Sequence, residues 1–182
     1  MPFVETVAEG DAEGPNYAKV FSTRPDVYAK WTALNDAIKA GMDQRRYELA
    51  TIAAARRLRS TYCTLAHGSV LLDQGLMDET TLAAVVEDHR SAAGLSEVDV
   101  AVMDLADKVA ADATSVTQAD VDRLKALGLS DADVVDVVLA AAARAFFSKT
   151  LDALGAAADP KYAALDPELR AVLTVGRPIA DA

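Results

Sequence analysis

Apolar residues along this chain recur at the three-to-four-residue spacing of α-helices, and stretches that alternate with a period of two are hard to find. In the stretch from Pro25 to Gly41 they follow one helix face: Val27, Trp31, Leu34 and Ile38. Pro25 suits the first turn of a helix and Gly41 suits its end. We therefore predict a helix here, preceded by a short helical turn near 17–21.

Later helix starts are marked by a serine or threonine three residues before an aspartate, as at Ser96, Thr117 and Ser130. With Asp43 and Ser60 as further N-caps, predicted helices cover about 44–58, 61–74, 78–89, 97–110, 118–127 and 131–154. The inward-facing residues of the last are predicted to be Val134, Val137, Val138, Ala141, Ala145 and Phe146. An all-α fold follows.

The chain is expected to hold one domain between two less regular ends. Residues 1–15 mix Glu, Asp, Gly and Pro without periodicity and are interpreted as an N-terminal arm. Residues 16–155 form the single all-α domain. The tail, 156–182, contains three prolines and allows only short helical turns. Its apolar residues lead us to expect that it packs on a neighbouring subunit.

The charge, the apolar runs and the cysteine content of the chain limit which partners and which cellular compartment are expected. Among 182 residues, 28 acidic and 18 basic side chains give a formal charge of -10, which opposes nucleic-acid binding. The N-terminus has no basic region before an apolar run, and the longest apolar run near 137–143 is too short to cross a bilayer. A single cysteine excludes an internal disulfide and suits a reducing compartment. We expect a cytoplasmic protein with no membrane partner.

The residues most suited to catalysis lie in the stretch 45–72, which holds the only cysteine and one of two histidines. If Ser60 is the N-cap of the second helix, Cys63 is its N3 residue, beside unpaired backbone N–H groups. His67 follows one turn later on the same face. Glu48 lies on the preceding helix and completes a carboxylate, imidazole and thiol set.

This spacing resembles the alkylhydroperoxidase D / carboxymuconolactone decarboxylase superfamily. Its peroxidase branch carries a glutamate, eleven residues, Cys-x-x-Cys, three residues and a histidine. Glu48, Cys63 and His67 match this motif, and Tyr62 is a residue often found before the second cysteine. Ser60 departs from it, since it stands where the first cysteine belongs. The resemblance implies a helical bundle of about seven to eight helices.

The resemblance also implies a thiol-dependent peroxidase with an antioxidant role, in which Cys63 attacks a hydroperoxide and becomes a sulfenic acid. Ser60 cannot form the disulfide of the two-cysteine members, so we expect an external thiol to reduce the sulfenic acid. A homo-oligomer, trimer or hexamer, is implied as well. No cofactor and no metal are expected.

A thiol attacks only when ionised, and an ordinary cysteine has a pKa of about 8.5. A helix N-terminus contributes roughly 0.3 to 1 kcal/mol, which shifts a pKa by less than about one unit. We therefore expect His67, as base or imidazolium, and the positive charges of Arg56, Arg57 and Arg59 to supply the rest. Glu48 is expected to orient or protonate His67.

Other interpretations stay open at this point. Ser60 favours a non-catalytic helical oligomer or redox sensor that has lost the two-cysteine cycle. A decarboxylase-like lyase and a metal site made of Glu48, Cys63 and His67 are weaker alternatives. Tyr62 is expected to support the site by packing, and the arginines to form a solvated or intersubunit face. His89 is expected to be a surface or structural residue.

Overall fold

A computed structural model describes residues 2–4 and 14–180 of the chain. Within these residues the chain is all-α, as predicted, with nine α-helices, two 3-10 helices and an isolated parallel bridge between Ala158 and Ile179. The α-helices are α1 (Asn16–Val20), α2 (Pro25–Ala40), α3 (Gln44–Arg57), α4 (Thr61–Asp73), α5 (Glu79–Asp88), α6 (Glu97–Asp112), α7 (Gln118–Ala126), α8 (Asp131–Ala153) and α9 (Pro167–Leu173). The 3-10 helices are η1 (Ala113–Ser115) and η2 (Pro160–Ala164).

The helix starts confirm the predicted capping residues. Asp43 accepts a hydrogen bond from the amide of Arg46 at the start of α3. Ser96, Thr117 and Ser130 each form a capping box, in which the aspartate three residues later binds back to the N-cap amide. These local contacts satisfy backbone N–H groups that a helix cannot pair internally, which explains why the sequence located the starts well.

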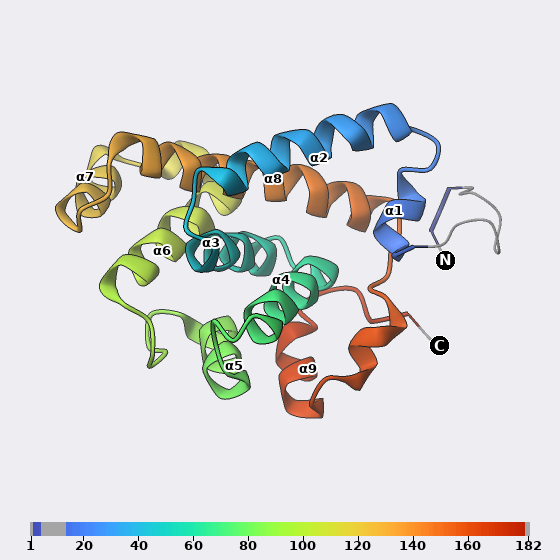
Figure 1. Cartoon of the computed structure of the whole chain (residues 1–182). Helices are drawn as coiled ribbons and strands as arrows, with labels where there is room; N and C mark the ends of the chain where they lie inside the picture. The colour runs from blue at the N-terminus through green and yellow to red at the C-terminus, as the bar shows by residue number, and fades with distance from the viewer. Residues whose placement is uncertain (1, 5–13, 181–182) are drawn as a thin grey trace.

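Helix α3 is the centre of the fold, since every residue from 47 to 55 is buried. It packs against α4, α6 and α8, and Figure 1 shows it between these helices. Its alanines at 50 and 53–55 leave little bulk between neighbouring backbones. The central position places Glu48, an acid on α3, inside the protein rather than on its surface.

Helices α2 and α8 lie side by side along one edge of the bundle (Figure 1). Two predictions on these helices are wrong. Leu34 was expected to face inward but has 52% of its surface exposed, and Phe146 has 45% exposed. The buried face of α8 follows spacings of four and three residues, because a helix repeats every 3.6 residues. Its residues are Val137, Ala141, Arg144, Ser148 and Leu151.

The C-terminal tail packs on its own chain. Helix α9 lies against α4 and α5 through Leu169 and Leu173 (Figure 1). The side chain of Leu173 packs against Gly68 in α4, and a side-chain carbon added at Gly68 would lie 3.4 Å from it. Contact of the tail with a neighbouring subunit stays a prediction. Most of the predicted N-terminal arm, 5–13, lies outside the described residues.

Candidate active site

The break between α3 and α4 brings the motif residues to the edge of a pocket. Arg59 has φ of 57°, the left-handed conformation, and this turns the chain sharply after α3. Ser60 is the N-cap of α4, as predicted, and Cys63 lies in its first turn. Only 2% of Cys63 is exposed, so the sulfur is reached through the pocket rather than from the open surface.

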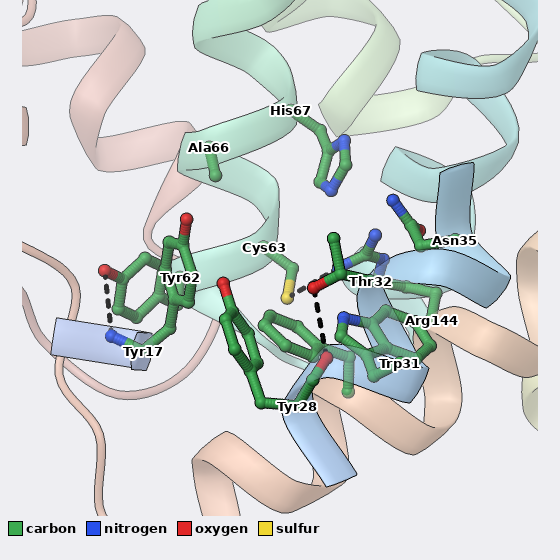
Figure 2. Close-up of a pocket in the computed structure, with 11 residues that line it drawn as sticks. Tyr17, Tyr28, Trp31, Thr32, Asn35, Tyr62, Cys63, Ala66, His67 and Arg144 are labelled. Atoms are coloured by element: carbon green, nitrogen blue, oxygen red, sulfur yellow. Dashed lines mark hydrogen bonds between the residues drawn. The ribbon is translucent and has the colours of Figure 1, made fainter. Parts of the chain in front are cut away.

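The pocket has a volume of about 260 Å³ and is lined from α1, α2, α4 and α8 (Figure 2). Half of the chain's ten Phe, Trp and Tyr residues border it: Tyr17, Tyr28, Trp31, Tyr62 and Phe147. Its polar lining comes from Thr32, Asn35, His67 and Arg144, and Cys63 lies between the two kinds of residue. A flat, largely apolar ligand with one polar end suits such a wall.

Glu48 and His67 form a direct contact across α3 and α4. Nδ1 of His67 lies 2.5 Å from Oε2 of Glu48, whose side chain is buried. Burial is the main cause that lowers the pKa of His67 to about 4, followed by the charge of Arg144, while Glu48 opposes both. A neutral imidazole therefore donates from Nδ1 to the carboxylate. Its other nitrogen, Nε2, faces into the pocket (Figure 2).

The hydrogen bonds to the Cys63 sulfur come from α8. Nη1 of Arg144 lies 3.5 Å from the sulfur, and the hydroxyl of Ser148 donates to it over 3.1 Å. Both donors are buried, Arg144 with 4% exposed and Ser148 with none. Burial works to lower the pKa of Arg144, but its interactions with Cys63 and Tyr47 outweigh burial and raise the value.

The predicted supporting residue Tyr62 joins three separate segments beside the pocket. Its hydroxyl donates to Asp159 in the C-terminal segment and accepts from the amide of Tyr17 in α1. Asp159 in turn accepts from the amide of Asn16. Burial, followed by the hydrogen bond to Asp159, raises the pKa of Tyr62, so its phenol stays neutral. Tyr62 thus holds α1 against the pocket.

Ser60 and the arginines of α3 do not line the pocket. Ser60 is buried and its hydroxyl interacts with Asp152, where burial raises the pKa of the carboxyl group. Arg57 pairs with Asp107, and Arg56 donates to the carbonyl of Glu87. The expectation that these arginines supply the positive charge at the sulfur is therefore wrong.

Arg59, the third arginine of that group, donates to the carbonyl of Val175. The cation at the sulfur is Arg144, which sequence reasoning missed. A signal for it exists, because Arg144 is the only charged residue between Val137 and Phe147. Ser148 lies one turn further on the same face. The remaining histidine, His89, is buried and pairs with Asp104, which is a structural role.

The model of the carboxymuconolactone decarboxylase family matches residues 25–108, a range that includes Glu48, Cys63 and His67. Over these residues the chain is similar to the carboxymuconolactone decarboxylase family. This confirms the resemblance inferred from the motif. A comparison with curated proteins finds no significant match.

Several solved structures share the fold of this chain. An uncharacterised peroxidase-related protein from Ralstonia eutropha JMP134, with an alkylhydroperoxidase core, is 22% identical, with a TM-score of 0.73 over 90% of this chain and 83% of its own. One from Silicibacter sp. TM1040 is 20% identical, with a TM-score of 0.74 over 82% and 79%. The debrominase Bmp8, as a cysteine-to-alanine variant with 2,3,4-tribromopyrrole, is 16% identical, with a TM-score of 0.67 over 87% and 81%. The structures that share this fold thus include peroxidase-related proteins and a debrominase.

Two further observations concern the described part of the chain. No helix there combines the length and the apolar content needed to cross a membrane. No group of three or more His, Cys, Asp or Glu side chains there is arranged to hold a metal ion. The chemistry that the site offers is thus that of a thiol, an imidazole held by an acid, and a buried guanidinium.

Proposed function

We propose that the protein is a thiol-dependent peroxidase-like oxidoreductase in which Cys63 reduces an organic hydroperoxide. The observation that carries this proposal is the sulfur itself, which accepts two hydrogen bonds at the edge of an aromatic pocket that it shares with the Glu48–His67 pair. A thiol placed in this way is accessible to a small ligand yet screened from bulk solvent. Such placement suits a reacting group rather than core packing.

The reaction proceeds by attack of the Cys63 sulfur on the terminal oxygen of the hydroperoxide. An S–O bond forms while the O–O bond breaks, the sulfur loses two electrons, and an alkoxide leaves. The ring proton of the neutral His67 lies on Nδ1, so Nε2, which faces the pocket, accepts a hydrogen bond from a solvent water. That water gives the alkoxide its proton, and the buffer neutralises the hydroxide that remains. Glu48 holds the imidazole in the orientation that this transfer needs. The products of this half-reaction are a sulfenic acid on Cys63 and an alcohol.

An external low-molecular-weight thiol completes the cycle, because this chain has no second cysteine. The thiol attacks the sulfenic acid, releases water and forms a mixed disulfide with Cys63. A second thiol then displaces Cys63, which returns to its reduced form while the two external thiols leave as a disulfide. Each hydroperoxide therefore consumes two thiols.

The decisive experiment follows hydroperoxide consumption by the purified protein with an excess of external thiol. Wild type is expected to turn over, and Cys63→Ser to fall to the rate without protein. Mass spectrometry after peroxide treatment should find a sulfenic acid at Cys63. Ser60→Cys is the comparison, since it restores the Cys-x-x-Cys pattern and should yield an internal disulfide instead. Equal consumption by wild type and Cys63→Ser would overturn the proposal.

A second candidate is the reductive debromination of a brominated aromatic ring, favoured by the aromatic lining and by the shared fold of debrominase Bmp8. The thiolate would attack bromine, the carbon–bromine bond would break, and the ring carbon would take a proton. An external thiol would then displace bromide from sulfur, and a second thiol would release Cys63. Bromide release from 2,3,4-tribromopyrrole, measured beside the peroxide assay, separates the two reactions.

A further inference from the structure

Arg144 carries a buried positive charge that forms no ion pair with a carboxylate among the described residues. A guanidinium stays protonated in proteins, and an unpaired buried ion is strongly destabilising. Arg45 and Arg57, which are more exposed, pair with the carboxylates of Asp99 and Asp107. Arg144 takes part in no ion pair among the described residues, although only 4% of its surface is exposed. Arg144 is therefore free to stabilise a negative charge on a group that borders the pocket.

Two groups that can take a negative charge interact with Arg144, the phenol of Tyr47 and the sulfur of Cys63, and the sulfur is the one that borders the pocket. Nη1 of Arg144 donates to it, and so does the hydroxyl of Ser148. Both contacts make the sulfur an acceptor, which suits a thiolate better than a thiol with a proton of its own to donate. The ring of Phe147 lies 5.5 Å from the guanidinium and fixes its plane without neutralising its charge.

We propose that Arg144, assisted by Ser148, holds Cys63 as a thiolate in the resting protein, and that this ionisation does not require His67. The inference rests on the proposed function only in that a thiolate is the form that attacks a hydroperoxide. It assigns the cation of the site to α8, 81 positions along the chain from the cysteine. His67 is then left with positioning the water that protonates the leaving group.

The other titratable groups around the sulfur are consistent with this assignment. They come from every element packed on it: Tyr17 on α1, Tyr28 on α2, Tyr47 and Glu48 on α3, Tyr62 and His67 on α4, and Tyr162 in η2. Burial raises the pKa of Tyr17, Tyr62 and Tyr162, so these phenols stay neutral at pH 7. Glu48 opposes a second negative charge nearby, but its carboxylate is engaged by Nδ1 of His67.

The imidazole is a poor counter-ion in this arrangement. Burial and the charge of Arg144 both oppose protonation of His67, so at pH 7 the ring is neutral and cannot balance a thiolate. Lys39, which lies 5.4 Å from the ring of Tyr47, acts on His67 in the same direction. The relay predicted from the sequence, in which His67 takes the thiol proton, is thus replaced by a permanent cation.

The test measures the thiolate directly, without peroxide. The ultraviolet absorbance of the thiolate and the rate of alkylation by iodoacetamide are recorded near pH 6, where an ordinary thiol with a pKa of about 8.5 is almost wholly protonated. Wild type should show the thiolate signal. Arg144→Met should lose it, and its alkylation rate should fall about tenfold or more. Arg144→Lys should restore part of both, because it keeps the charge but not the planar donor geometry.

Two further variants complete the design. His67→Gln should keep the thiolate signal and the alkylation rate while hydroperoxide reduction falls. Arg57→Met is the matched control, since it also removes an arginine but one that pairs with Asp107 away from the pocket, and it should leave both signals unchanged.

The inference is overturned if wild type shows no thiolate near pH 6, or if His67→Gln loses it. It is also overturned if Arg144→Met, folded by circular dichroism, keeps it. Should Arg144→Met fail to fold, the comparison of wild type with Arg144→Lys and His67→Gln still decides. A protein with a thiolate but no turnover would refute the proposed function and leave this inference standing.

Discussion

At the scale of single residues, the chemistry of the site depends on which of its buried side chains carry a charge. The protein buries a carboxylate, a guanidinium and a thiol within one region and leaves one imidazole neutral between them. Cys63 and His67 could be placed together from their spacing, because neighbours one turn apart on a helix stay neighbours in any fold. Glu48 was identified through the motif of the family that the sequence resembles. Arg144 could not be found in this way, since its contact with Cys63 depends on how α8 lies against α4.

The lowered pKa of His67 predicts a dependence of stability on pH. The unfolded chain binds a proton near pH 6.5, whereas the folded chain resists it until about pH 4. The free energy of unfolding should therefore fall as the pH drops through this window, by at most about 3 kcal/mol. Urea titrations of wild type and His67→Gln at several pH values measure this. A slope that is equally steep in His67→Gln would contradict the assignment.

At the scale of elements, the connection between α3 and α4 is held from outside by the C-terminal segment. The amide of Gly176 donates to the hydroxyl of Thr61 over 2.8 Å, at the first residue of α4. A side-chain carbon added at Gly176 would lie 1.9 Å from the carbonyl oxygen of Arg59. The tail and the turn before the cysteine therefore need a glycine to approach this closely.

Gly176→Ala is thus expected to destabilise the fold by more than about 1 kcal/mol, because the atom it meets is backbone and cannot move aside alone. Chemical denaturation measures the change. Gly41→Ala is the matched control, since the added carbon there meets only the carboxylate of Asp136, which can rotate away. Its loss of stability should be smaller, and an equal loss in the two variants would argue against the close approach at 176.

Helix α8 offers a second test at this scale, because it carries both donors to the sulfur but begins far from them. The hydroxyl of Ser130 accepts from the amide of Asp133 and caps the helix. Ser130→Ala should cost about 1 kcal/mol of stability. The thiolate signal of Cys63 should not change, since the cap lies three turns or more from Arg144. Loss of the signal would mean that α8 shifts as a unit.

At the scale of the whole molecule, an apolar groove of about 570 Å³ lies between α2 and α8. It is bordered by the exposed side chains of Leu34, Leu139 and Phe146, with the opposite charges of Asp26 and Lys30 on its rim. Exposed apolar surface of this kind marks a contact site. We propose that a second copy of the chain covers it, in line with the homo-oligomer that the family resemblance implies.

Analytical ultracentrifugation should accordingly find wild type larger than a monomer. Leu34→Asp, which places a charge in the groove, should shift the sedimentation coefficient toward that of a monomer and leave the helical circular dichroism unchanged. Val135→Asp is the control, as Val135 is also exposed but does not line the groove. A monomeric wild type, or equal effects of the two variants, would refute this interface.

The wall between this groove and the Cys63 pocket is Trp31, which lines both. The sequence placed Trp31 correctly as a buried residue on a helix, because apolar spacing determines which face turns inward. It misplaced Leu34 and Phe146, because spacing cannot tell a face that packs on its own chain from one left open. Only the arrangement of α2 against α8 distinguishes them.

The sequence by itself determined the all-α class, the starts of the helices and which residues share a face of one helix. These depend on local hydrogen bonds and on the 3.6-residue repeat, which residues close together in the sequence determine. The tertiary structure alone decided that Arg144 and Ser148 reach the sulfur, that the α3 arginines do not, and that Tyr62 ties α1 to Asp159. Such contacts join residues far apart in the chain, and their formation depends on how whole helices pack.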